Sequence, residues 1–292
     1  MVFTFNEERR LPFVYENLKD FCEIIVFDGG STDGTEEFCR KNNIKFILRP
    51  ASTKVHSQEN RQSEGMWPDI LRFAYSHCPT EYVLHVFGAH FYPPALLKEY
   101  SRIASQNEKT AVYCDLVCWR YGGIVHQAFL RRVPSVCNFY KKSIMNFERT
   151  KIHDEMGILF DKKTMVRLKS NNRNSLHLFQ DENYLSATNK NIKYSEIDAR
   201  QRFNAGARHG VLQGILKAFW RFLYSYVRLG SFRFGSRGLV YAIINLQYDI
   251  SIALMVWELS NDLGGTTPVK KNTEARAALL RQFGYRQLSD NE

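Results

Sequence analysis

The stretch that decides the fold is Glu23–Thr35, with the sequence EIIVFDGGSTDGT. Apolar residues run from Ile24 to Phe27, which is typical of a buried strand. The glycines that follow allow a tight turn, and Ser31, Thr32 or Asp33 can cap a helix that begins after it. The pattern therefore predicts a strand, a sharp turn and a helix, with Asp28 at the end of the strand.

Outward from this stretch, strands and helices alternate. The expected strands cover residues 2–5, 23–27, 45–48 and 81–86, and the expected helices cover 7–20, 34–42 and 70–77, with a further helix opened by Pro93-Pro94. This alternation predicts an α/β fold with a mostly parallel sheet flanked by helices. In such sheets ligands bind at the carboxyl ends of the strands, so the loops after residues 5, 27 and 86 are where chemistry is expected.

Composition limits the class of protein. Of the 292 residues, 44% are hydrophobic and 24% are charged, which excludes a disordered chain and a small disulfide scaffold. The net charge of +10 favours an acidic partner, which leaves a nucleotide, a phospholipid surface or a nucleic acid open. Six cysteines without a zinc spacing are expected to be buried, reduced thiols, and the amino terminus does not resemble a secretory signal, so we expect a cytosolic chain.

The composition changes near residue 199. Residues 199–237 contain eight basic and no acidic side chains, and the apolar residues of 211–227 fall on one helical face, which predicts a basic amphipathic helix. The next run, 238–259, is nearly long enough to span a membrane but contains Asp249. Because a mid-bilayer Asp costs about 2.5–3.5 kcal/mol, we expect a helix that lies in the membrane interface or packs on its basic neighbour. The expected division is 1–198, a basic region 199–265 and a polar tail 266–292.

A second motif precedes the decisive stretch. Thr4–Leu11 reads TFNEERRL and puts Asn6 and Glu7 directly after the first expected strand. Together with EIIVFDGGSTDGT, it resembles the amino-terminal half of family 2 glycosyltransferases, which have the GT-A fold. The resemblance implies that Asn6, Glu7 and Asp28 surround the nucleotide of a nucleotide-sugar donor, and that Ser31 and Asp33 shape that turn.

Looser resemblances follow along the chain. They lie at KIHDE (151–155), at LKSNNRNSLHLF around His177, in 193–206 and in the apolar run before residue 260, and they are similar to the branch that adds sugars to lipopolysaccharide core and other surface glycans. The resemblance implies that Asp154 or Glu155 is the catalytic base and that His153 orients the acceptor or contacts the diphosphate. His177 is left open between an acceptor pocket and a core position.

One motif of the family is missing. Family members carry Asp-x-Asp after the strand that corresponds to 81–86, whereas this chain has Phe87-Gly88-Ala89. His85 and His90 nearby are poor ligands for a hard cation, so no divalent metal is expected there. Either basic side chains such as Lys141, Lys142 and Lys151 stabilise the departing diphosphate, or catalysis is lost.

The expected function is therefore that of an enzyme. It transfers a sugar from a UDP-sugar to a lipid-linked or surface-glycan acceptor, with inversion and without a metal. We expect it on the cytoplasmic face of the membrane, docked to anionic lipid through 199–237, with packing of that helix onto the first domain as the alternative. No nucleic acid is expected as a partner, because no binding motif accompanies the basic helix. The competing hypothesis is a degenerate relative that serves as a binding or scaffold protein in a glycan-assembly complex.

Overall fold

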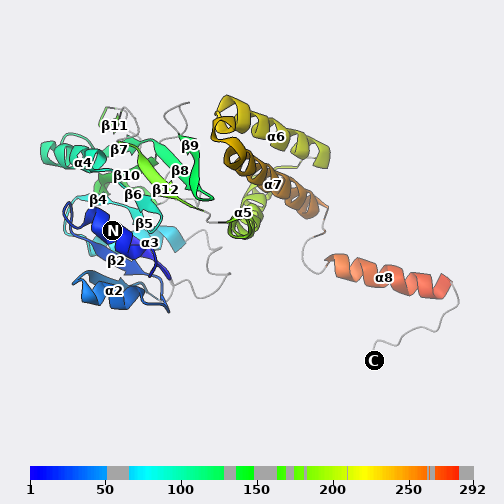
Figure 1. The fold of residues 1–292 in the computed structure, drawn as a ribbon. Coiled ribbons are helices and arrows are strands. Elements are labelled where there is room, and N and C mark those ends of the chain that lie inside the picture. Colours follow the sequence, from blue (N-terminus) through cyan, green and yellow to red (C-terminus); the bar gives the residue numbers. More distant parts are fainter. Residues whose placement is uncertain are drawn as a thin grey trace. The chain divides into compact units, whose positions relative to one another are not determined.

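The computed structural model describes residues 1–50, 66–127, 136–147, 163–168, 174–180, 183–208, 210–261, 263 and 267–282 (Figure 1). The strands are β1 (Val2–Thr4), β2 (Ile25–Asp28), β3 (Lys45–Leu48), β4 (Tyr82–Leu84), β5 (Val86–Phe87), β6 (His90–Phe91), β7 (Ala111–Cys114), β8 (Leu116–Arg120), β9 (Gly123–Gln127), β10 (Val136–Lys141), β11 (Met165–Arg167) and β12 (Leu176–Phe179). The helices are α1 (Leu11–Leu18), α2 (Thr35–Lys41), α3 (Met66–Ser76), α4 (Pro94–Gln106), α5 (Tyr184–Asn204), α6 (Val211–Leu223), α7 (Gly235–Ser260) and α8 (Thr267–Gln282).

The strands form three four-stranded sheets. Sheet A has the order β3-β2-β1-β5 and is parallel throughout, sheet B has the order β11-β7-β10-β4, and sheet C has the order β6-β12-β8-β9. Only His85 separates β4 from β5. The His85 N–H donates to the Asn138 carbonyl of β10, and the Val86 N–H donates to the Met1 carbonyl beside β1. The strand predicted over 81–86 is therefore central, as expected, and joins sheets A and B.

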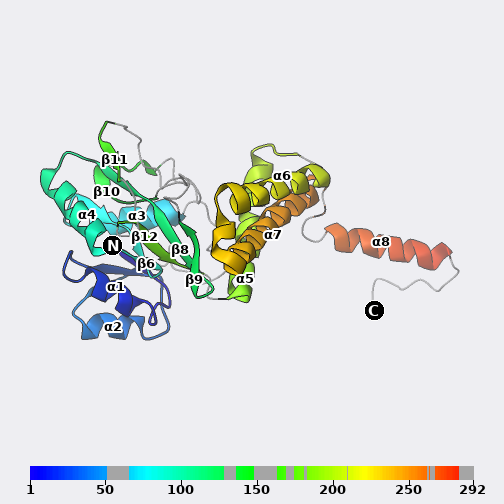
Figure 2. The same cartoon turned by 45° about the horizontal axis from the view of Figure 1, so that its top comes forward.

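Side-chain alternation along the strands builds a core on each face of sheet A. Val2 of β1 packs with the buried side chains of α1 and α4, whereas its neighbour Phe3 packs with those of α3. Figure 2 shows these helices around the sheet. A parallel sheet that is covered on both faces confirms the predicted α/β fold class.

The first helix is shorter than predicted. It begins at Leu11 rather than at residue 7, because the Glu7 and Glu8 N–H groups donate to Thr35 Oγ1 and Asp33 Oδ2 in the next loop. Asn6 has a left-handed backbone with φ of 56°, which ends β1 and starts this loop. The expected strand over 23–27 also shifts, to Ile25–Asp28. All six cysteines are free thiols, but Cys22 is exposed, contrary to the prediction that they are buried.

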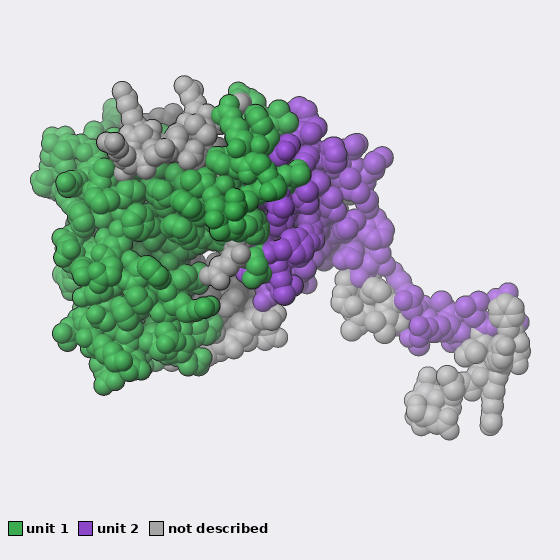
Figure 3. Space-filling model, viewed as in Figure 1, with its two compact units in different colours: residues 1–183, 227–239 green, residues 184–226, 240–292 purple. Residues whose placement is uncertain are grey.

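The chain divides into two units, coloured in Figure 3. The first contains residues 1–183 and 227–239, and the second contains 184–226 and 240–292. In the second unit α6 and α7 pack closely, since a Cβ placed on Gly214 would lie 2.5 Å from the Ala253 Cβ. The α-helix of α6 ends at Leu223 and continues as a π-helical turn to Arg228, and the expected tail contains α8. The boundaries 198 and 265 stay a prediction.

The apolar run is the long helix α7. By length and composition alone, Ser231–Ser260 could cross a membrane, with a mean hydropathy of 1.6 in its most apolar window, of which 28% is buried. Asp249 is held at Arg221 of α6, with 2.5 Å between its Oδ1 and the Arg221 Nη1, and its side chain is only 10% exposed. Packing on the basic neighbour, one of the two expected arrangements, is thus observed within this unit.

Candidate active site at the carboxyl edge of sheet A

The two predicted loops lie against each other. The Asn6 N–H donates to Ser31 Oγ at 2.8 Å, and Asn6 Oδ1 accepts the Thr32 N–H at 2.8 Å. Two residues further on, the Glu8 carboxylate accepts the Gly34 N–H at 3.1 Å. Because these bonds run in both directions, the loops after β1 and β2 form a single rim at the carboxyl edge of sheet A.

The Asp28 carboxylate lies beneath this rim and accepts hydrogen bonds from it. Its side chain is almost fully buried and accepts the Gly30 and Ser31 N–H groups, both at 2.6 Å. It also accepts the Thr4 hydroxyl at 2.9 Å and the Ser31 hydroxyl at 2.5 Å. Four donors match the capacity of a carboxylate. The Ser31 hydroxyl can rotate, so it is the partner that a ligand hydroxyl could most easily replace.

Asp33 holds the start of α2. It accepts the Thr35 hydroxyl at 2.5 Å and the Glu8 N–H at 3.1 Å. Burial raises the pKa of this carboxyl, but the hydrogen bonds from Thr35 and the neighbouring amides outweigh burial, so the pKa is lowered. Asp33 therefore stays ionised and fixes the turn.

Glu7 faces the position where the family has Asp-x-Asp. A Cβ on Gly88 would lie 2.2 Å from Glu7 Oε2, so the carboxylate lies directly over this glycine. Arg10 forms an ion pair with Glu7, with 2.7 Å between its Nε and Glu7 Oε2, and its Nη2 donates to Glu7 Oε1 at 3.0 Å. Burial raises the pKa of Glu7, and Arg10 opposes that shift.

The residues at this turn do not fit a hard divalent cation. Glu7 is the carboxylate observed beside the turn, and Arg10 neutralises it. His90 Nδ1 accepts the Phe87 N–H at 3.3 Å, and burial lowers its pKa to about 4, so it is a neutral group engaged in holding the turn. Among the described residues no cluster of three His, Cys, Asp or Glu side chains could hold a metal. Magnesium prefers several oxygen ligands, and this turn does not supply them.

A cavity of about 760 Å³ opens beside Gly88. It is lined by Arg10, Phe13, Gly88, His90, Phe91, Trp119, Arg120, Tyr121, Gly122, Gly123, Phe179 and Gln180. Sequence reasoning missed the part of it that sheet C contributes. The two arginines and the aromatic rings give it a cationic, flat-sided interior.

Arg49 was also missed. It follows β3 at the same edge as Asp28 and is 5% exposed. Its guanidinium fills the space over Gly29, where a Cβ would lie 2.0 Å from Nη2, and Nη2 donates to the Thr4 carbonyl at 3.4 Å. Burial lowers the pKa of Arg49, and the Asp28 charge opposes that shift. A charged residue directly after a strand was the available signal, the same one that identified Asp28.

The other predicted residues divide into two groups. The candidate base residues Asp154 and Glu155, together with His153 and Lys151, lie outside the described residues. Lys141 and Lys142 are described, but their ammonium groups donate to the carbonyls of Asn107 and Cys78. In the register of β10 with β4, Lys141 lies opposite Tyr82 at the amino end of β4, whereas Phe87 ends the following strand, β5. Lys141 therefore does not replace a metal at that turn.

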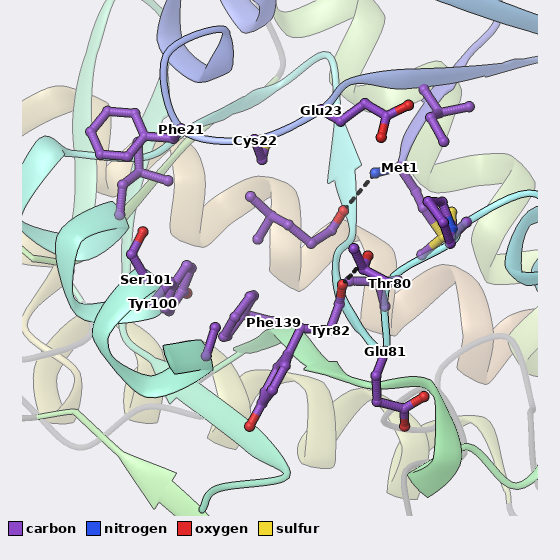
Figure 4. A pocket seen from close by; sticks show the side chains of 17 residues that line it. Met1, Phe21, Cys22, Glu23, Thr80, Glu81, Tyr82, Tyr100, Ser101 and Phe139 are labelled. Carbon is purple, nitrogen blue, oxygen red and sulfur yellow. Dashed lines mark hydrogen bonds between the residues drawn. The ribbon is translucent and has the colours of Figure 1, made fainter. Parts of the chain in front are cut away.

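A second cavity, of about 500 Å³, lies at the opposite edge of the sheet (Figure 4). Met1, Glu23 and Glu81 line it, and each of them precedes a strand. Its wall includes stacked rings, with centroids 5.2 Å apart for Tyr82 and Phe139 and 4.6 Å apart for Tyr100 and Phe139. Because it lies at the amino ends of the strands, it is separate from the rim at Asp28.

Comparisons with known proteins agree with the motifs. Residues 1–63 match the model of the family described as "Glycosyl transferase family 2". Among solved structures, TarS from S. aureus is similar at 14% identity and a TM-score of 0.42, over 86% of this chain and 54% of TarS. TarS 1-349 in complex with UDP-GlcNAc is similar at 15% identity and a TM-score of 0.43, over 89% of this chain and 90% of that one.

Glucosyl-3-phosphoglycerate synthase from Mycobacterium tuberculosis, in complex with phosphoglyceric acid, is similar at 13% identity and a TM-score of 0.42, over 72% of this chain and 80% of that one. This chain thus spans about half of the full-length TarS structure. At such identities and TM-scores, the likeness says nothing about substrate. The match over residues 1–63 covers the segment that contains both facing loops, and it agrees with the family that the two motifs resemble.

Proposed function

We propose that the chain transfers a sugar from a UDP-sugar to a glycan or lipid-linked acceptor at the carboxyl edge of sheet A. The observation that carries the proposal is the interlocked rim, in which Asn6 and Ser31 hold two strand ends together beside buried Asp28. Rigid loops with hydroxyl, amide and carboxylate groups at this edge suit a ribose and a base. Asn6, Glu7, Asp28, Ser31 and Asp33 are the proposed donor-site residues.

The proposed reaction inverts the anomeric centre. The acceptor hydroxyl attacks the anomeric carbon on the side opposite the diphosphate, while a carboxylate removes its proton. Asp154 or Glu155 is the proposed base, with His153 orienting the acceptor. D154N and E155Q should be compared in transfer assays. The base variant should lower kcat by roughly a hundred-fold or more, whereas the other should not.

Arg10 is the proposed substitute for a metal at the diphosphate. It is about half exposed and lines the same cavity as Gly88, so its guanidinium can approach an anion at that turn while it stays paired with Glu7. A planar guanidinium suits phosphate oxygens. The Arg10 guanidinium would then stabilise the negative charge that develops on the leaving diphosphate.

A hydrolysis assay with a panel of UDP-sugars tests donor use and metal need together. We expect turnover that is unchanged by EDTA and falls at least roughly ten-fold in R10M, since a charge-assisted contact contributes about 1.5–3 kcal/mol. R9M is the matched control, because Arg9 is exposed on the same loop. Turnover that EDTA abolishes, or equal effects of R9M and R10M, would contradict this role.

The second candidate is a binding or scaffold protein of a glycan-assembly complex. The absence of carboxylates at Phe87-Gly88-Ala89 favours it. It predicts that UDP binds in calorimetry with and without Mg²⁺ but that no UDP-sugar is turned over. Turnover of any member of the panel rejects it.

We also propose that α6 docks on the anionic cytoplasmic face of the membrane. Large apolar side chains of α6 are exposed, among them Leu212 at 70% and Trp220 at 69%, beside Lys217 and Arg221. Apolar burial and lipid charge then act on the same helix. In flotation with anionic vesicles at low salt, W220E should stay at the bottom while L279E, altered at an exposed leucine of α8, floats like the unaltered chain. Equal flotation of the two variants contradicts the role of α6.

A further inference from the structure

We propose that the sheet C side of the cavity binds a pyranose ring of the acceptor, on a floor formed by Trp119 and Phe179. This inference rests on the proposed glycosyl transfer, which requires an acceptor hydroxyl near Gly88. It assigns the substrate class of a surface for which neither the family motifs nor the sequence gave a role.

The register of the parallel strands β8 and β12 places the residues of the floor side by side. Phe179 of β12 lies opposite Trp119 of β8, and Phe91 of β6 lies opposite His177, two residues before Phe179. Because alternate residues share a face, these side chains project from one face of sheet C. The Trp119 and Phe179 rings are stacked, with centroids 5.3 Å apart and 18° between their planes, so Trp119 supports one face of Phe179 and leaves the opposite face for a ligand.

His177 holds the Trp119 ring in place. The indole N–H of Trp119 donates to His177 Nδ1 at 2.9 Å, which fixes both the indole orientation and the histidine tautomer. Phe179 is 46% exposed, so its ring is available to a ligand. The isolated histidine of the sequence is therefore assigned as a positioning residue for the floor.

The rim of the floor carries planar hydrogen-bonding groups. Arg120 Nη2 donates to Gln180 Oε1 at 2.9 Å, and both side chains line the cavity. The turn from Tyr121 to Gly123 closes one side, and a Cβ on Gly122 would meet open space. A pyranose has a face of C–H groups and a perimeter of hydroxyls, which matches flat rings bordered by amide and guanidinium groups. A lipid chain has no hydroxyl groups to offer to this polar rim.

We assign the floor to the acceptor rather than to the donor because of where it lies in the fold. The Phe179 N–H donates to the Ala89 carbonyl at 2.8 Å, so the floor begins beside the turn that replaces Asp-x-Asp. The rim at Asp28 belongs to sheet A, whereas the floor belongs to sheet C, with Gly88 between them. A sugar on the floor can thus present a hydroxyl toward the diphosphate end of a donor.

The test uses the full chain and two probes. Methyl β-D-glucopyranoside and methyl β-D-galactopyranoside are followed by saturation-transfer NMR, and UDP is followed by calorimetry. We expect saturation of the C–H protons on one face of the sugar. Removing either ring, in W119A or in F179A, should weaken glycoside binding roughly three- to ten-fold. UDP binding should be unchanged. W257A is the matched control, because Trp257 is an exposed tryptophan of α7.

The outcomes separate the floor from the proposed function. Unchanged glycoside binding in F179A, whose exposed ring can be removed without opening a core, overturns the floor even if W119A does not fold. Loss of both UDP and glycoside binding in a folded F179A overturns its assignment to the acceptor. Failure of the unaltered chain to bind UDP counts against the proposed function alone. For the positioning role, H177N, which keeps an acceptor atom near the indole N–H, should retain glycoside binding that H177L loses. Equal binding by the two variants rejects it.

Discussion

Gly29 and Arg49 should be energetically coupled. In Gly29→Ala the new Cβ would lie 2.0 Å from Arg49 Nη2 and 3.1 Å from its Cζ, whereas Cβ contacts under 3.0 Å essentially never occur. The guanidinium must therefore move by about 1 Å in a site where Arg49 is 5% exposed. Such overpacking costs about 1–3 kcal/mol. Arg49→Met keeps the stem and removes both contacting atoms, at a cost of about 1–2 kcal/mol for the lost polar contacts.

The double variant G29A/R49M should then be about 1–2 kcal/mol more stable than the sum of the single changes implies, because the clash no longer exists. Urea unfolding followed by circular dichroism gives the four free energies of the cycle. G123A is the control, since its Cβ would meet Arg237 instead, at 2.9 Å, and should add independently to R49M. Additivity of G29A and R49M within about 0.5 kcal/mol would refute the close contact over Gly29.

Three further predictions concern charge. Burial lowers the pKa of His90 to about 4, below its usual 6.5, so His90 takes up a proton more readily in the unfolded chain than in the folded one. The folded state should therefore lose up to about 3 kcal/mol of stability as pH falls from 6.5 to 4. H90N keeps an acceptor for the Phe87 N–H, and its melting temperature should fall less over this range. Burial raises the pKa of Glu7, so its contribution to stability is present at acid pH and lost as pH rises through the raised pKa, and E7Q should flatten this part of a melting-temperature profile. R221M should destabilise the helical unit by about 1–2 kcal/mol in urea titrations, more than D249N does, because it leaves the largely buried Asp249 carboxylate without its partner; an equal effect of both changes would contradict this asymmetry.

Local patterns predicted the two loops at the carboxyl edge of sheet A well. The strand that ends at Asp28, the turn after it and the loop at Asn6 are each encoded within a few residues, and parallel strands place their carboxyl ends at one sheet edge, so the two loops meet there. Arg49 was within reach of the same reasoning, because it directly follows a strand.

The floor could not be predicted in this way. Trp119 and His177 are 58 positions apart, and their contact depends on the register of β8 against β12, which no local pattern specifies. Likewise, the pairing of Arg221 with Asp249 depends on how α6 packs on α7. The polar interruption of the apolar run indicated that Asp249 needs a partner but did not identify it.

The segment that matches the family model is not expected to fold alone. Residues 1–63 supply β1, β2 and β3, but the second edge of β1 is covered by β5, from residues 86–87. An isolated fragment ending at residue 63 would expose the backbone of Val2 and Phe3 along an apolar edge, which is a template for aggregation. Chimeras that exchange this segment should therefore be spliced after Phe87, so that β5, which covers the second edge of β1, is exchanged together with the loops.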